Sequence, residues 1–284
     1  MRPFQWLTHL FYTILYFTTL PEYDNNPIND MYIFPYDTRT QNASSAAYLL
    51  DALRLNFHFL RQGLGTIHVE RIEYRKSRSA GEHEYLVVTM KESVGAWRRG
   101  YFLVDRLDDN PLHRSSGYRS WFLDPPRGLD RLFILCKPIE VQNVLGRCAY
   151  DVLMTMDVPK PVTLEDFLAL VRAIARNSPR RRAISQSYQF AYTIWRTLEI
   201  ETGANVDRTS HAVRQGYRSG RNLAAGEGET PEKAKLLWEE EKVVVGQEID
   251  ASIKVSLTFF RRIDLDTSVQ RLNAPFIKLS ETIQ

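Results

Sequence analysis

Apolar residues recur at spacings of three and four along five segments of this chain, the pattern of an amphipathic α-helix. The five segments are residues 4–17, 44–62, 164–176, 185–201 and 230–263. A serine or threonine that can cap the first turn stands at the start of the last four, at Ser44 or Ser45, Thr163, Ser185 and Thr230. Gly246 lies within the last segment and leaves its continuity open. The pattern therefore predicts helices in all five segments.

Five other runs, rich in β-branched and aromatic residues, are typical of strands. They cover residues 66–76, 83–90, 99–107, 131–141 and 150–158. Polar and apolar residues alternate in the second and third runs, with a glycine-containing turn between them, and Pro138 ends the fourth run at Lys137. We expect an α+β fold: an antiparallel sheet of about five strands, with helices 44–62, 164–176 and 185–201 packed on it.

Changes in composition divide the chain into four parts. Residues 1–42 hold an apolar helix and a connection rich in Pro, Asn and Asp. Residues 43–202 form the α+β core, with a surface loop rich in Pro, Gly and Ser at 108–128. Residues 203–229 combine Gly, Ser and Arg with few apolar groups, which predicts a mobile linker. Residues 230–284 are expected to form a helical C-terminal extension.

The N-terminal apolar segment, residues 4–20, is too short and too often interrupted by polar residues to cross a membrane. It matches a signal peptide poorly, because Thr-Thr-Leu-Pro is an unfavourable cleavage site. The polar face of the helix lacks the Lys and Arg side chains that anionic lipids select, which favours packing on the body over a membrane-surface anchor. Peripheral membrane contact through this segment, and secretion, stay open as alternatives.

Charge and cysteine content narrow the function classes. The formal net charge is only +3 and is spread among many acids, so a nucleic-acid partner is not expected. Cys136 and Cys148 have no second cysteine or histidine at metal-ligand spacing, and the chain has no glycine-rich phosphate loop. We therefore expect no metal or cofactor. Two thiols in so long a chain fit a reducing compartment, the cytoplasm.

A polar triplet, Ser-Gln-Ser at 185–187, opens the aromatic-rich fourth helix. With Ser185 as N-cap, Gln186, Ser187 and Tyr188 occupy the first helical turn, where free backbone N–H groups and the helix dipole stabilise an anion. Nucleophilic side chains are often placed at such a position. A small polar residue in a first turn is also commonplace, so the triplet alone assigns no chemistry.

Three short motifs follow one another in a definite order: "HEYLVV" beginning at His83, "LVDR" containing Asp105, and "QSYQFA" containing Ser187. This order resembles circularly permuted papain-like proteins, such as the lecithin-retinol acyltransferase-like group and the NlpC-type amidases. The likeness is greatest to a family of uncharacterised fungal proteins with "HEY", "LDR" and "QCYWFA" in these places. It covers approximately residues 66–202 and implies a permuted papain-like arrangement, with the 185–201 helix against the sheet that carries His83.

The chain departs from that family at the reactive position, because Ser187 stands in place of the cysteine and Gln189 in place of a tryptophan. A neighbouring histidine can ionise a thiol, whereas an alcohol reacts only if a base removes its proton during attack. The departure favours a catalytically impaired domain that binds a protein, a peptide or an acyl ligand. The alternative is a hydrolase or acyltransferase for amide, ester or acyl-lipid bonds, with Ser187 as nucleophile, His83 as base and Asp105 as orienter.

Further residues would shape the mouth of such a site. Gln186 and Tyr188 flank Ser187, and Arg182 ends a run of three arginines just before the helix. These arginines fit a solvated turn, or they attract an acidic partner or a lipid headgroup. His83 and Asp105 also have plain structural interpretations, as a hydrogen-bonded histidine at a sheet edge and as a residue at a strand end.

Overall fold

The computed structural model describes ten stretches of the 284-residue chain, which are residues 44–56, 59–78, 82–94, 98–106, 130–135, 137–145, 149–177, 183–218, 221–222 and 230–280. The N-terminal helix expected at 4–17 and the surface loop expected at 108–128 lie outside the described residues. The described chain has an α+β fold, as the sequence predicts.

Six strands form one antiparallel open sheet in the order β4-β3-β2-β1-β5-β6. The strands are β1 (Ile67–Ser77), β2 (Glu84–Glu92), β3 (Arg99–Arg106), β4 (Asp130–Leu135), β5 (Tyr150–Asp157) and β6 (Val206–Arg208). The first five coincide with the five runs expected from the sequence. The β1–β2 ladder pairs Lys76 with Glu84, which brings two ionisable residues to one end of the sheet.

Four longer helices and several short elements complete the fold. The longer helices are α2 (Ala46–Leu55), α4 (Leu164–Asn177), α5 (Ala183–Thr202) and α6 (Pro231–Ser280). The short elements are η1 (Phe59–Gly63), η3 (Pro138–Glu140), α3 (Val141–Val144), η4 (Ser210–Arg214) and the hairpin β7 (Tyr217–Arg218) and β8 (Arg221–Asn222). Ser45 caps α2 by accepting a hydrogen bond from the Tyr48 N–H (3.1 Å).

Two helix boundaries differ from the expected ones. The helix expected at 44–62 ends at Leu55, because the Asn56 side chain accepts a hydrogen bond from the Phe59 N–H (3.0 Å) and begins the separate turn η1. Helix α5 begins at Ala183 instead of just after Ser185. The N–H of Ser187 therefore belongs to the regular helical ladder, not to the free groups of the first turn.

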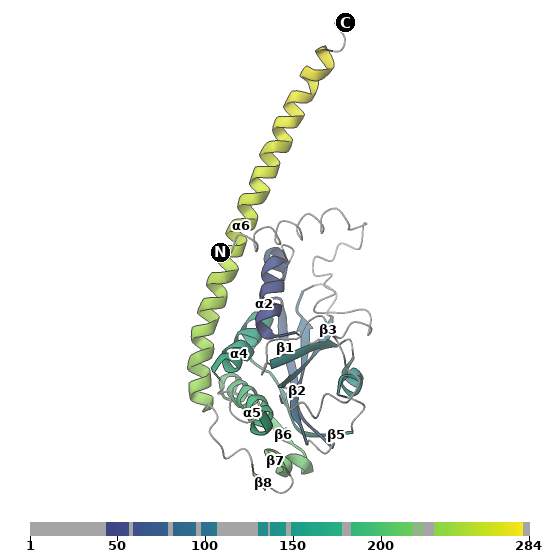
Figure 1. The fold of residues 1–284 in the computed structure, drawn as a ribbon, viewed down its shortest axis with the longest axis vertical. Coiled ribbons are helices and arrows are strands. Elements are labelled where there is room, and N and C mark those ends of the chain that lie inside the picture. Colours follow the sequence, from purple (N-terminus) through teal and green to yellow (C-terminus); the bar gives the residue numbers. More distant parts are fainter. Residues whose placement is uncertain are drawn as a thin grey trace.

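The two faces of the sheet are covered differently (Figure 1). Helices α2, α4 and α5 lie on one face, called the helix face below, and bury the larger core there, which includes Leu50, Tyr74, Leu86, Phe167 and Trp195. The other face, called the outer face, carries a smaller cluster of Tyr85, Val87, Leu103, Phe133, Leu135 and Val141. Because side chains alternate along a strand, neighbouring residues of one strand belong to different cores.

Helix α6 runs along α4 and then continues beyond the body (Figure 1). Trp238 is buried, and its indole N–H donates a hydrogen bond to the Asp166 carbonyl oxygen (2.7 Å). The buried Arg172 of α4 pairs with Glu241 and with Glu248 of α6. Gly246 does not interrupt the helix. Polar contacts as well as apolar burial therefore hold this helix on α4.

Residues 203–218, the first part of the segment expected to be a linker, lie against the body. Strand β6 pairs with β5, the Thr209 hydroxyl donates to the Val152 carbonyl oxygen (2.7 Å), and Arg214 pairs with Asp151. The linker was expected from the shortage of apolar residues in this segment. In the described part of the segment, hydrogen bonds, ion pairs and the few apolar side chains, such as Ala204 and Val206, attach the chain to the body.

Candidate functional site

Two of the expected site residues meet on the outer face. Asp105, near the end of β3, contacts the His83 Nε2 with one carboxylate oxygen and the Arg131 guanidinium with the other. The Asp105 side chain is completely buried, whereas His83 and Arg131 remain 24% and 21% exposed. We call these three residues the outer cluster. Because Nε2 faces Asp105, the Nδ1 atom of His83 is the one available to a further partner.

Asp105 is held in its charged form. Burial raises the pKa of Asp105, but Arg131 and His83 more than offset burial and hold the pKa well below the usual range of an aspartate. An ionised, buried carboxylate that fixes an imidazole is what a catalytic base requires as its orienter. The outer cluster therefore contains two parts of the expected constellation.

Ser187 lies on the helix face. It is buried, and the residues that follow it in α5, among them Phe190 and Trp195, pack in the larger core. The Trp195 ring meets the Tyr74 ring edge to face, with 5.8 Å between the centroids. Arg106, the neighbour of Asp105 in β3, places its guanidinium over the Phe190 ring at 5.3 Å. Arg106 thus faces α5, and Asp105 faces away from it.

The sheet therefore separates Ser187 from the outer cluster. The His83 ring stacks on Tyr85 (6.2 Å between centroids), and Tyr85 belongs to the core of the outer face. Asp105 lies two residues from Leu103 in β3 and so shares that face. Among the residues that the structure describes, no hydrogen bond joins Ser187 to His83 or Asp105. The structure brings the expected base and orienter together and does not bring the expected nucleophile to them.

The expected residues of the site mouth are described in part. Tyr188 is buried, and its hydroxyl donates a hydrogen bond to the Glu82 carbonyl oxygen (2.8 Å). This bond ties the beginning of α5 to the turn before β2. The backbone of Gln186 belongs to α5, but its side chain lies outside the described part of the structure, as does all of Arg182.

A second polar cluster lies on the helix face at the same end of the sheet. Tyr74, Lys76 and Glu84 are each completely buried, and we call them the inner cluster. The Tyr74 hydroxyl donates to one Glu84 oxygen (2.6 Å), and the Lys76 Nζ and the Gly216 N–H donate to the other (3.3 and 2.8 Å). Burial raises the pKa of Glu84, while these three donors act in the opposite direction.

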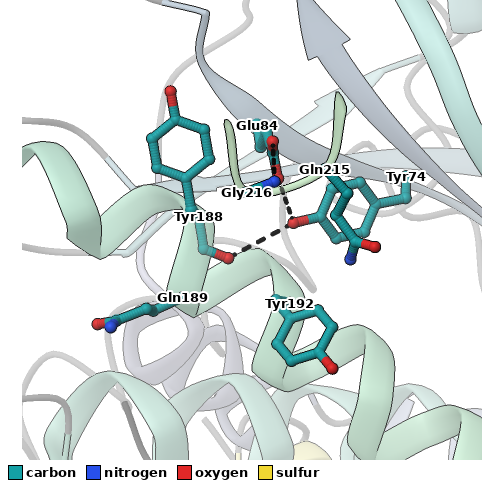
Figure 2. Close-up of a pocket in the computed structure, with 7 residues that line it drawn as sticks. All are labelled: Tyr74, Glu84, Tyr188, Gln189, Tyr192, Gln215 and Gly216. Atoms are coloured by element: carbon teal, nitrogen blue, oxygen red, sulfur yellow. Dashed lines mark hydrogen bonds between the residues drawn. The ribbon is translucent and has the colours of Figure 1, made fainter. Parts of the chain in front are cut away.

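A small pocket opens beside the inner cluster, with an empty volume of about 220 Å³ that includes the part open to solvent. Figure 2 shows the hydrogen bonds of Glu84 on one side and the beginning of α5 on the other. The lining residues are Tyr74, Glu84, Tyr188, Gln189, Tyr192, Gln215 and Gly216. The pocket thus lies between α5 and the turn that follows η4.

The inner cluster was not predicted from the sequence. Glu84 directly follows His83, and the motif drew attention to the histidine alone. Strand alternation was the signal that could have found the cluster, since Tyr74 and Lys76 share one face of β1 and Glu84 faces the same side from β2. Gly216, which completes the cluster, comes from the segment that composition assigned to a linker.

Comparison with known proteins adds no family to this geometry, because no family model, no curated protein and no solved structure matches the chain. Within the described residues, no group of three or more His, Cys, Asp or Glu side chains could hold a metal ion. No helix in the described part of the chain is long and apolar enough to cross a membrane.

Proposed function

We propose that this chain is a catalytically impaired papain-like domain that acts by binding a protein or a peptide-like ligand. The observation that carries the proposal is the position of Ser187 on the helix face, with His83 and Asp105 on the outer face. A serine hydroxyl becomes a nucleophile only when a base can take its proton, and this base is on the other side of the sheet. His83 contacts Asp105, but neither residue is hydrogen-bonded to Ser187 in the described part of the structure.

The pocket on the helix face is the binding site that we favour. Binding sites are concave and combine apolar or aromatic walls with a few fixed polar groups. Tyr188 and Tyr192 supply aromatic walls, and the inner cluster supplies polar groups that neighbouring hydrogen bonds hold in place. Such a rigid polar base costs little to organise when a ligand arrives.

A second candidate is a hydrolase or acyltransferase that uses Ser187. The contact between His83 and the ionised Asp105 favours it, because the orienter of a base is already in place. This activity requires Ser187 to reach the outer face, which would pull the beginning of α5 out of the core.

Covalent labelling of the full chain with a fluorophosphonate separates the two candidates. An activated serine forms a bond to phosphorus and expels fluoride, so labelling reports an assembled nucleophile and base. We expect no labelling of Ser187 and no difference between wild type, Ser187→Ala and Ser256→Ala. Ser256 is a matched control, since both serines are 5% exposed. Labelling at Ser187 that disappears in His83→Ala would overturn the proposal.

A further inference from the structure

The outer cluster fixes which nitrogen of the His83 ring carries the proton. Asp105 is ionised, because Arg131 and His83 hold its pKa well below the usual range, and an ionised carboxylate can only accept hydrogen bonds. The His83 Nε2 contacts Asp105, so this nitrogen is the one that bears the hydrogen. Neutral His83 therefore has its free lone pair on Nδ1.

The lone pair on His83 Nδ1 is open to an incoming molecule. Two contacts hold the ring: Nε2 meets Asp105, and the ring face stacks on Tyr85, with 6.2 Å between the centroids and 22° between the planes. Within the described residues, no hydrogen bond engages Nδ1, and the His83 side chain is partly exposed. The ring is thus held in one orientation with its reactive nitrogen unoccupied.

The buried carboxylate strengthens Nδ1 as a nucleophile. When Nδ1 attacks an electrophile, the ring gains a positive charge, and the Nε2–H bond to Asp105 stabilises that charge. Asp105 is completely buried, so water screens this interaction little. Arg131 contacts the other oxygen of Asp105 and holds the carboxylate in place. The cluster therefore activates His83 without the help of a serine.

The other two histidines in the described part of the chain lack this arrangement. The His211 Nε2 is 3.8 Å from Asp151, which is beyond hydrogen-bond distance, and Asp151 is bonded to two arginines. The Nδ1 atom of His68 is buried, so an electrophile does not meet it. Among these three histidines, His83 alone combines an ionised hydrogen-bond partner with an open nitrogen.

The charges of the cluster favour a phosphoryl group as the electrophile. Arg131 is partly exposed beside Asp105 and brings a cation to the outer face, which offsets part of the cost of an incoming phosphate dianion. A neutral acyl group would gain nothing from that cation. A phosphoryl group on Nδ1 also leaves the contact between Nε2 and Asp105 intact.

We propose that His83 is a phosphoryl acceptor, with a phosphoramidate as the class of donor. The Nδ1 lone pair forms a bond to phosphorus as the P–N bond of the donor breaks, and the donor nitrogen leaves as a neutral amine with the protons it already carries. His83 keeps its Nε2 proton and becomes a phosphorylated imidazolium paired with Asp105. This inference goes beyond the proposed function, because neither Ser187 nor the pocket on the helix face takes part.

The test is incubation of the full chain with potassium phosphoramidate, with the rate at each histidine followed by mass spectrometry and the bonded nitrogen identified by ³¹P NMR. We expect phosphorylation of His83 at Nδ1 to be at least tenfold faster than that of His211, the effect of one hydrogen bond to a charged group. Exposure alone predicts the opposite order, since His211 is 47% and His83 24% exposed. Equal rates, or a phosphoryl group on Nε2 of His83, would overturn the proposal.

Variants then test the carboxylate. Asp105→Asn keeps the shape of the side chain without its charge and should slow the reaction of His83 at least tenfold, with the rate at His211 unchanged. Asp151→Asn makes the same change beside His211 and should leave His83 unaffected. An unchanged rate at His83 in Asp105→Asn would overturn the role of the carboxylate.

A measurement on the wild type keeps the proposal testable if Asp105→Asn does not fold. Long-range ¹H–¹⁵N NMR of the neutral His83 ring should show the proton on Nε2 and the lone pair on Nδ1. A proton on Nδ1 would overturn the proposal.

Discussion

The outer and inner clusters lie on opposite faces of the sheet, although His83 and Glu84 are adjacent in the sequence. In the outer cluster, Asp105 is buried but its partners His83 and Arg131 still reach solvent. In the inner cluster, all three side chains are completely buried and satisfy one another. Successive side chains of a strand point to opposite faces of the sheet, so two adjacent residues of one motif take part in different clusters. The face that a residue takes therefore decides its chemistry here more than the motif that contains it.

The largest difference between the clusters should appear when each carboxylate is removed. Glu84→Ala should lower the free energy of unfolding by about 3–5 kcal/mol, because it removes the acceptor of the Tyr74 hydroxyl and of the Gly216 N–H. It also leaves the buried Lys76 paired with Glu82, whose side chain is more exposed. Asp105→Ala should cost less, about 1–3 kcal/mol, because its partners can regain water. Urea denaturation measures both losses. Equal losses would contradict the contrast between the inner cluster, whose side chains are completely buried, and the outer cluster, whose two cations reach solvent.

The clusters should also give opposite dependences of stability on pH. The pKa of Asp105 is lowered in the folded state, so its contribution to the free energy of unfolding is complete above the unfolded-state pKa of about 3.9. This contribution is lost as the pH falls. The pKa of Glu84 is raised in the folded state, so its contribution to the free energy of unfolding is complete below the unfolded-state pKa of about 4.3. This contribution is lost as the pH rises.

Isosteric variants isolate these two dependences in urea denaturation across the acid range. As the pH rises, wild type should gain stability relative to Asp105→Asn and lose stability relative to Glu84→Gln. Each variant serves as the control for the other, since both replace a carboxylate with an amide. Two dependences of the same sign would show that the clusters do not differ as their burial and partners indicate.

A smaller effect is expected at the glycine that closes the inner cluster. Gly216→Ala should cost about 1–2 kcal/mol, because a Cβ is strained in the left-handed region. Gly246→Ala, at an open position within α6, should stabilise by about 0.5–1 kcal/mol through helix propensity. Thermal denaturation compares the two. Stabilisation by both substitutions would argue against a fixed backbone at Gly216.

Periodicity predicted much of the fold, because apolar spacing follows directly from which faces are buried. The five strand runs and the helix at 164–176 are present nearly as expected. Short-range hydrogen bonds were harder to foresee: Asn56 ends α2 through its own side chain. Strand β6 was missed because its segment has few apolar residues, and backbone pairing and ion pairs supply much of its attachment to the sheet.

The candidate site was predicted less completely than the fold. The contact between His83 and Asp105 followed from the motif order and is present in the structure. The position of Ser187 could not be derived from the sequence, because α5 begins two residues before its expected cap. The motif order also carries no information about which face of the sheet a side chain takes. Glu84 also accepts a hydrogen bond from Gly216, which is 132 residues away, and no local sequence pattern connects these two residues.

The separation of Ser187 from His83 is tested by the reaction of iodoacetamide with Ser187→Cys, in a chain whose Cys136 and Cys148 are replaced by Ala. The rate is measured against pH with His83 present and with His83→Ala. With the sheet between the two positions, His83→Ala should leave the rate unchanged, and the thiol should titrate no lower than an ordinary cysteine, with a pKa of about 8.5. A thiol that ionises well below this value, and loses that property in His83→Ala, would show that the two residues meet and would contradict their separation by the sheet.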